Sequence, residues 1–379
     1  MRPGRPIVSN LSRRNRFAGS ARLRLTCSTT PGGCASKHYC AAAGKALPAI
    51  VLGVLASVGT VDGQWVPLLR TLVRVEPGDK SEADLQRRLL QQAQAGLAAD
   101  EALVCDRGFG LAQVQGAGLE RYVVRGPSNF TARRAVAPDY CGRGRRPTRG
   151  EIVRPLPRRY KGQTIAATPP DRVAVWQAGQ CWRPVRLRAE FWDNLVRSDV
   201  VSDVVSDVAS QVTAGVATFN CVVIHDPRYA EPLLLNSPLA LSGEQLRRLY
   251  LDRWPIEQLP LAAKQMLGAA RQFVFAEQSC QRLPELALLA GGILMYAAAT
   301  QEAVATGFWD RTPQPTCGRL RRLLARTDMQ HFRELFKRPE QLRKKHSATA
   351  HLPKGILGHR RHKASTRHSR GELLGTLWK

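Results

Sequence analysis

Acidic residues are scarce in this chain, and the first of them along the sequence is Asp62. Lys and Arg number 57 against 30 Asp and Glu, so the formal charge at pH 7 is +27. Such an excess favours a polyanionic partner, because a basic surface releases the counterions that surround nucleic-acid phosphates. Ribosomal and histone-like proteins share this charge but are usually far shorter. A chain of 379 residues with 44% hydrophobic composition can bury a large core, which favours a globular enzyme.

The chain also lacks closely spaced cysteine pairs and long apolar runs. Its nine cysteines are scattered and form no C-x-x-C pair, which argues against a zinc ribbon and against a disulfide framework. We therefore expect reduced thiols in the cytoplasm. The apolar stretches 47–61 and 286–299 are better explained as a strand of a hairpin and as a core helix than as membrane spans. We expect no membrane association.

Four polar residues share one stripe of a helix near residue 250. At about 100° per residue, Tyr250, Arg253, Glu257 and Lys264 fall within roughly 60° of one another. A solvated charged face would be the ordinary explanation of such a stripe. Apolar residues occupy the same sector, however, and unpaired charge beside apolar surface is costly. The stripe is therefore a candidate binding or catalytic face.

A second candidate residue is Asp106, which follows the apolar run Ala102–Cys105 and precedes Arg107-Gly108. This pattern predicts a buried strand that ends in a tight turn and presents a carboxylate there. An Asx-turn residue with no further role would have the same pattern. The segment 119–125, which ends in Arg125, reads as the next strand.

The spacing Tyr-x2-Arg-x3-Glu-x6-Lys, together with Asp106, resembles the YREK signature of the DDE-class insertion-sequence transposases of bacteria. The resemblance implies an α/β fold: a ribonuclease H-like core, with a mixed sheet and flanking helices, interrupted by a β-rich insertion. It makes Asp106 and Glu257 catalytic ligands of two Mg²⁺ or Mn²⁺ ions. Tyr250 and Arg253 would hold phosphate, Lys264 would contact the transposon end, and Arg125 would bind DNA from an arginine-bearing strand.

One part of the family pattern is missing. The resemblance requires a first catalytic Asp on a strand before the hairpin, and the segment 25–31 has Ser28 at that position. Serine is a poor ligand for Mg²⁺. We interpret the sequence as truncated or degenerate at its N-terminal side, and we expect this copy to be inactive in strand cleavage.

The chain is expected to divide into five segments. They are a basic, weakly structured segment at 1–45; the first part of the catalytic core at 46–126; a basic loop and β-rich insertion at 127–218; the second part of the core with the YREK helix at 219–337; and a basic tail at 338–379. In the first core part, Asp62-Gly63 between two apolar runs predicts a hairpin over 49–76, and an amphipathic pattern predicts a helix over 81–98.

The predicted function is that of a DNA transposase, which cuts and joins strands at the ends of an insertion sequence. Its partners would be double-stranded DNA, as terminal inverted repeats and target, and further copies of the chain on that DNA; its location would be the bacterial cytoplasm, at the nucleoid. Two alternatives remain. One is a non-catalytic DNA- or RNA-binding protein, and the other is a metal-dependent nuclease on the same fold.

Overall fold

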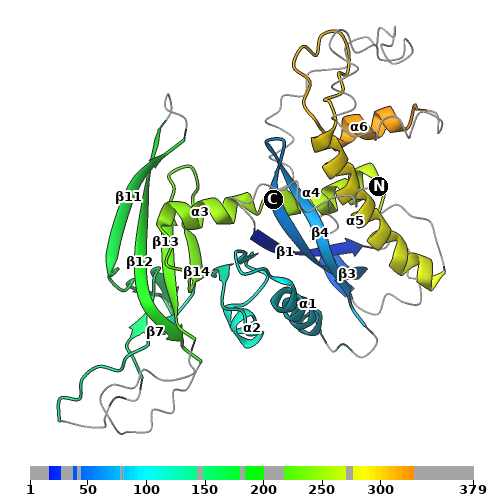
Figure 1. Cartoon of the computed structure of the whole chain (residues 1–379). Helices are drawn as coiled ribbons and strands as arrows, with labels where there is room; N and C mark the ends of the chain where they lie inside the picture. The colour runs from blue at the N-terminus through cyan, green and yellow to red at the C-terminus, as the bar shows by residue number, and fades with distance from the viewer. Residues whose placement is uncertain are drawn as a thin grey trace. The chain divides into compact units, whose positions relative to one another are not determined.

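The computed structural model describes residues 17–26, 37–40, 44–76, 79, 81–142, 147, 149–179, 184–199, 217–269 and 276–327. The chain divides into two compact units, Met1–Ala299 and Thr300–Lys379. The first unit is a mixed α/β structure built on one large sheet, and Figure 1 shows its elements. The second unit contains α6 (Cys317–Leu324) among its described residues.

The sheet begins with strands in the order β4-β3-β1-β5-β6. Strands β1, β5 and β6 are parallel, whereas β3 is antiparallel to both β1 and β4. β2 pairs with the start of β3. The bounds are β1 Phe17–Thr26, β2 Lys37–Cys40, β3 Lys45–Val61, β4 Gln64–Arg74, β5 Leu103–Cys105 and β6 Tyr122–Arg125.

Strands β3 and β4 confirm the predicted hairpin. Its turn residues Asp62 and Gly63 have φ of 46° and 79°. Positive φ at both central residues characterises the type I′ turn, whose twist matches that of the strands it joins, and this requirement explains the Asp-Gly pair.

Strand β1 lies within the segment 1–45, for which the sequence predicts little structure, and most of that segment lies outside the described residues. Basic side chains and few large apolar ones made this segment resemble a tail. In the structure β1 pairs with β3 on one side and with β5 on the other. Its place between two strands satisfies its backbone hydrogen bonds, and this tertiary pairing outweighs the weak strand propensity of its sequence.

Helices cover both faces of the sheet. On one face, α1 (Glu82–Gly96) and α2 (Leu111–Gly116) pack on Leu103 and Cys105 of β5. On the other face, α3 (Gly243–Asp252) and α4 (Pro255–Leu261) pack on Val104. Successive strand residues point to opposite faces, so a strand covered on both sides is apolar throughout. Helix α1 confirms the predicted amphipathic helix and starts at a capping box on Ser81.

Beyond β6 the sheet continues with antiparallel strands in the order β14-β13-β12-β7-β8, and β11 pairs with β12. Strands β11 and β12 lie within the segment 127–218, where a β-rich insertion is predicted, and β13 and β14 lie in the segment 219–337. The basic stretch 133–161 also contains short strands. The bounds are β7 Ala132–Arg134, β8 Ile152–Val153, β9 Arg158–Tyr160, β10 Gln163–Ile165, β11 Arg172–Ala178, β12 Val185–Arg197, β13 Phe219–His225 and β14 Leu233–Ser237.

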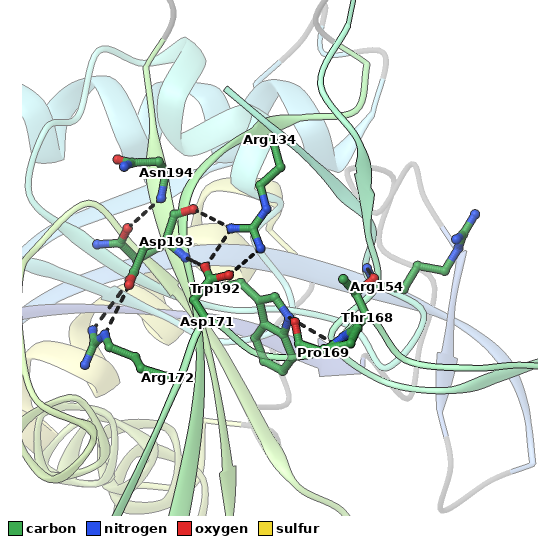
Figure 2. A network of polar contacts seen from close by, with 10 residues as sticks. Arg134, Arg154, Thr168, Pro169, Asp171, Arg172, Trp192, Asp193 and Asn194 are labelled. Atoms are coloured by element: carbon green, nitrogen blue, oxygen red, sulfur yellow. Dashed lines mark hydrogen bonds and ion pairs between the residues drawn. The ribbon is translucent and has the colours of Figure 1, made fainter. Parts of the chain in front are cut away.

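A network of ion pairs fastens this second part of the sheet to the basic stretch (Figure 2). The Asp171 carboxylate accepts from Arg134 Nη1 at 2.6 Å and Nη2 at 2.5 Å, and from the Asp193 backbone N–H at 2.8 Å. The hydrogen bonds from Arg134 lower the pKa of Asp171. Trp192, fully buried, donates from Nε1 to the Thr168 and Pro169 carbonyl oxygens.

The helical segment after β14 is interrupted, as Pro255 predicted. Helix α3 ends before Arg253, α4 begins at Pro255, and a π-helical turn, η4 (Ala262–Met266), follows. Helix α5 (Glu277–Thr300) comes next. Its part Gln278–Thr300 is the one described helix with the length and composition of a membrane span, but half of its apolar window is buried within the protein, which is compatible with a soluble protein.

Candidate nucleic-acid interface

Asp106, Arg125 and Tyr250 meet at the edge of the sheet where β5 and β6 end. The Tyr250 hydroxyl donates to Asp106 Oδ1 at 2.9 Å and accepts from Arg125 Nη1 at 3.2 Å. Arg125 Nη1 is also 3.7 Å from Asp106 Oδ1. The phenol therefore lies between a carboxylate and a guanidinium.

Arg253 joins this group to Glu257. Its Nη1 donates to Glu257 Oε1 at 2.8 Å, and its Nη2 is 3.8 Å from Asp106 Oδ2. The Arg253 side chain is only 5% exposed, while those of Asp106 and Glu257 are 41% and 38% exposed. One buried guanidinium thus bridges two accessible carboxylates. We call Asp106, Arg125, Tyr250, Arg253 and Glu257 the Asp106 cluster.

The fold explains why residues from distant parts of the chain meet here. Cys105 and Val124 are paired in the parallel β5 and β6, so Asp106 and Arg125, the next residues of each chain segment, reach the same sheet edge. Asp106 also opens a turn, in which its carbonyl accepts from the Phe109 N–H at 3.0 Å. On the opposite side, the Ser242–Gln245 capping box fixes the start of α3 and so sets the phase at which Tyr250 faces Asp106.

The electrostatics of the cluster keep its acid ionised and its phenol neutral. Burial pushes the pKa of Asp106 upward, but the Arg107 backbone N–H, the Arg253 charge, the Tyr250 hydroxyl and the Arg125 charge together lower it below its ordinary value. Burial, and then the charge of Asp106, raises the pKa of Tyr250. Tyr250 is therefore a hydrogen-bond donor at neutral pH.

Two predicted site residues are not among these contacts. Lys264 lies in η4, seven residues beyond Glu257 or about 10 Å along a helix, and is half-buried. Ser28 lies outside the described residues.

The pairing of β1 with β5 shows which β1 residue lies beside Asp106, where the family pattern requires its first catalytic Asp. Ser20 pairs with Cys105, so the β1 residue level with Asp106 is the next one, Ala21. The strand ends at Thr26, which is five residues or about 17 Å further along an extended strand. The backbone position beside Asp106 thus belongs to Ala21, seven residues before the predicted Ser28.

The residues present do not fit the two-metal site that the resemblance implies. No group of three or more His, Cys, Asp or Glu side chains suited to one ion occurs in the described part of the chain. The two carboxylates of the cluster are matched by two guanidinium charges, whereas a pair of divalent ions needs an excess of anionic oxygen ligands. As it stands, the cluster is electrically balanced.

A further set of residues was not singled out by the sequence. Arg186, Arg188, His225 and Tyr229 line a cavity of about 480 Å³ at one end of β11, β12 and β13. Strand pairing brings Arg186, Arg188 and His225 together and the loop after β13 adds Tyr229, so no motif in the sequence could have marked them. Comparison with known proteins adds no relative: no protein-family model matches the chain, and no curated protein matches it.

Proposed function

We propose that this chain is a DNA transposase of the DDE class, with a ribonuclease H-like core, whose centre is the Asp106 cluster. The observation that carries the proposal is the convergence of Asp106, Arg125, Tyr250, Arg253 and Glu257, chosen from the sequence and its family resemblance, in one contact network. Three residues of one helix stripe meet two residues from the ends of two different strands, which helical spacing alone does not require. The location proposed is the bacterial cytoplasm.

The order of elements supports the same proposal. The sequence suggested a ribonuclease H-like core that lacked its first strand, and β1 now precedes the β3–β4 hairpin, α1, β5 and β6.

In this copy the cluster would bind the DNA backbone without cutting it. Strand cleavage by the family chemistry requires three carboxylates around the metal ions, and here only Asp106 and Glu257 converge. Arg125, with its side chain 29% exposed, is the most accessible cation of the cluster. Arg253 is buried and would position the two carboxylates.

Binding and nicking assays test this function. We expect the protein to bind a DNA duplex in EDTA-containing buffer and to nick supercoiled plasmid in Mg²⁺ or Mn²⁺ only at the background rate. Arg125→Gln should weaken binding about fivefold, whereas the matched variant Arg121→Gln, at an exposed arginine outside the cluster, should change it less than twofold. If the two variants weakened binding equally, the Asp106 cluster would not be part of the DNA interface.

The alternative of a non-catalytic nucleic-acid-binding protein is favoured by the charge balance of the cluster. This alternative predicts that nucleic-acid binding does not depend on metal and does not change when Glu257 is substituted. Metal-dependent nicking by the unmodified protein would exclude this alternative and would show that the first acid lies elsewhere, with Asp62 the next residue to substitute.

A further inference from the structure

A second polar site lies on the exposed face of strands β11, β12 and β13. Strand register places Val175, Arg188 and His225 in one row across the three strands. Arg186 precedes Arg188 by two residues on the same face, and Leu187 between them is buried. These side chains form one wall of the 480 Å³ cavity.

The loop between β13 and β14 forms the opposite wall, and Asp226 fixes its shape. The Asp226 carboxylate accepts from Arg228 at its backbone N (3.1 Å), Nε (2.8 Å) and Nη2 (2.7 Å), and from Arg247 Nη2 (2.9 Å). These contacts, with Arg228 first, lower the pKa of Asp226 to about 2. The anchored loop places Tyr229, 62% exposed, at the cavity together with Pro227 and Pro232.

The charge of this site favours an anion. Arg186, Arg188 and His225 line it, and the one carboxylate in its lining is that of Asp226. Asp226 is paired with Arg228 and Arg247, and Glu190 is 2.7 Å from Arg188 and 3.4 Å from His225 Nε2. The Arg186 side chain makes no hydrogen bond or ion pair with the residues that the structure describes, so its charge remains available to a ligand.

We propose that this cavity binds one nucleotide of an unpaired DNA segment. Arg186 and Arg188 would hold its phosphate, and the Tyr229 ring with Val175 would receive the sugar and base. The volume lies in the range of small-molecule sites, and an aromatic ring beside basic groups is the combination that binds single strands. The proposal rests on the proposed function only in taking DNA as the partner, because the cavity shares no residue with the Asp106 cluster.

The experiment measures binding of a fluorescent 12-nucleotide single strand by anisotropy. Arg186→Gln/Arg188→Gln should lose at least tenfold in affinity relative to Arg121→Gln/Arg248→Gln, a control of equal charge change at exposed arginines outside the cavity. The slope of log K against log salt should become shallower by about 0.7, since the two arginines hold one phosphate and each single-strand phosphate contact contributes about 0.7. Tyr229→Ala should lose about fivefold, and Tyr229→Phe should retain the affinity.

The outcomes separate this inference from the proposed function. Equal losses in the two double variants, or a neutral Tyr229→Ala, would overturn the nucleotide site while DNA binding itself stands. If the protein binds no DNA, the proposed function fails, and calorimetry with deoxyadenosine monophosphate still tests the cavity. Inorganic phosphate that binds as tightly as this nucleotide would reduce the cavity to an anion site and would overturn the proposal.

Discussion

At the scale of single residues, Arg253 decides what the Asp106 cluster can bind. Its buried guanidinium contacts both carboxylates, and at an effective dielectric constant of 20 a charge pair about 4 Å apart interacts by about 4 kcal/mol. A divalent ion would have to displace this interaction to reach the same oxygens. Arg253 therefore supplies the positive charge between the two carboxylates that a metal ion would supply in a metal-binding site.

Removing that charge should create affinity for metal. We expect Arg253→Gln to bind Mn²⁺ at least tenfold more tightly than the unmodified protein, because both carboxylates lose their main cationic partner. Electron paramagnetic resonance of free Mn²⁺ measures this directly. Arg248→Gln removes an exposed arginine of α3 that pairs with Asp252, and it should leave Mn²⁺ binding unchanged. Unchanged binding in both variants would mean that Arg253 does not control access to the carboxylates.

The sequence could predict which residues lie together but not how they share charge. Helical spacing put Tyr250, Arg253 and Glu257 on one stripe, and the Asp-x-Gly pattern put Asp106 at a strand end. Pro255 marks the break of the helix, but the burial of Arg253 there depends on packing against the sheet and leaves no periodic signal.

At the scale of elements, the parallel pairing of β1 and β5 selects the position at which a third acid would meet the other two. We expect Ala21→Asp to give metal-dependent nicking or at least tighter Mn²⁺ binding, because Ala21 is level with Asp106 on the neighbouring strand. Ser28→Asp, the substitution that the sequence alone suggested, is the comparison. If Ser28→Asp gave nicking or tighter Mn²⁺ binding and Ala21→Asp did not, the pairing of β1 with β5 in this structure would not be the pairing in the active protein.

The strand β1 itself illustrates what the sequence conceals. Its ten residues, FAGSARLRLT, contain three large apolar side chains and two arginines, a composition that favours a solvated segment. β1 pairs with the long apolar β3 and the buried β5, and neither partner strand can be identified from the β1 sequence. The β3–β4 hairpin, in contrast, carries its own local signal at Asp62-Gly63.

The loop after β13 gives a prediction about pH. Because its cationic partners lower the pKa of Asp226 from 3.8 to about 2, the folded state is stabilised above pH 4, and this contribution disappears as the pH falls toward 2. Asp226→Asn should cost roughly 2 kcal/mol in the free energy of unfolding at pH 7, and the difference should shrink below pH 4. Urea unfolding at several pH values measures it.

Asp252 provides a control of opposite sign. Burial raises the pKa of its carboxyl, although Arg248 opposes the shift, so its ionised form is disfavoured in the folded protein. Asp252→Asn should therefore be neutral or stabilising at pH 7. If both variants were equally destabilising, loss of packing rather than charge would explain the Asp226 result.

At the scale of the whole molecule, the question is how DNA affinity divides between the described core and the basic ends. Residues 338–379 contain eleven Lys and Arg against two acids, and they lie outside the described residues. Such a segment contributes through counterion release, which is insensitive to geometry, whereas Arg125 acts at a fixed position in the Asp106 cluster.

Salt titrations of duplex binding separate the two contributions. The unmodified protein should show a slope of log K against log salt of about −0.9 per phosphate contacted. Replacing the basic residues of 338–379 by Gln should make this slope shallower and weaken binding, because fewer counterions are released. The fivefold effect of Arg125→Gln should persist in that background, since a positioned contact in the core does not depend on the charge of the tail. If the Arg125 effect vanished with the tail charge, binding at the Asp106 cluster would depend on the tail, and the cluster could not be an independent DNA-binding centre.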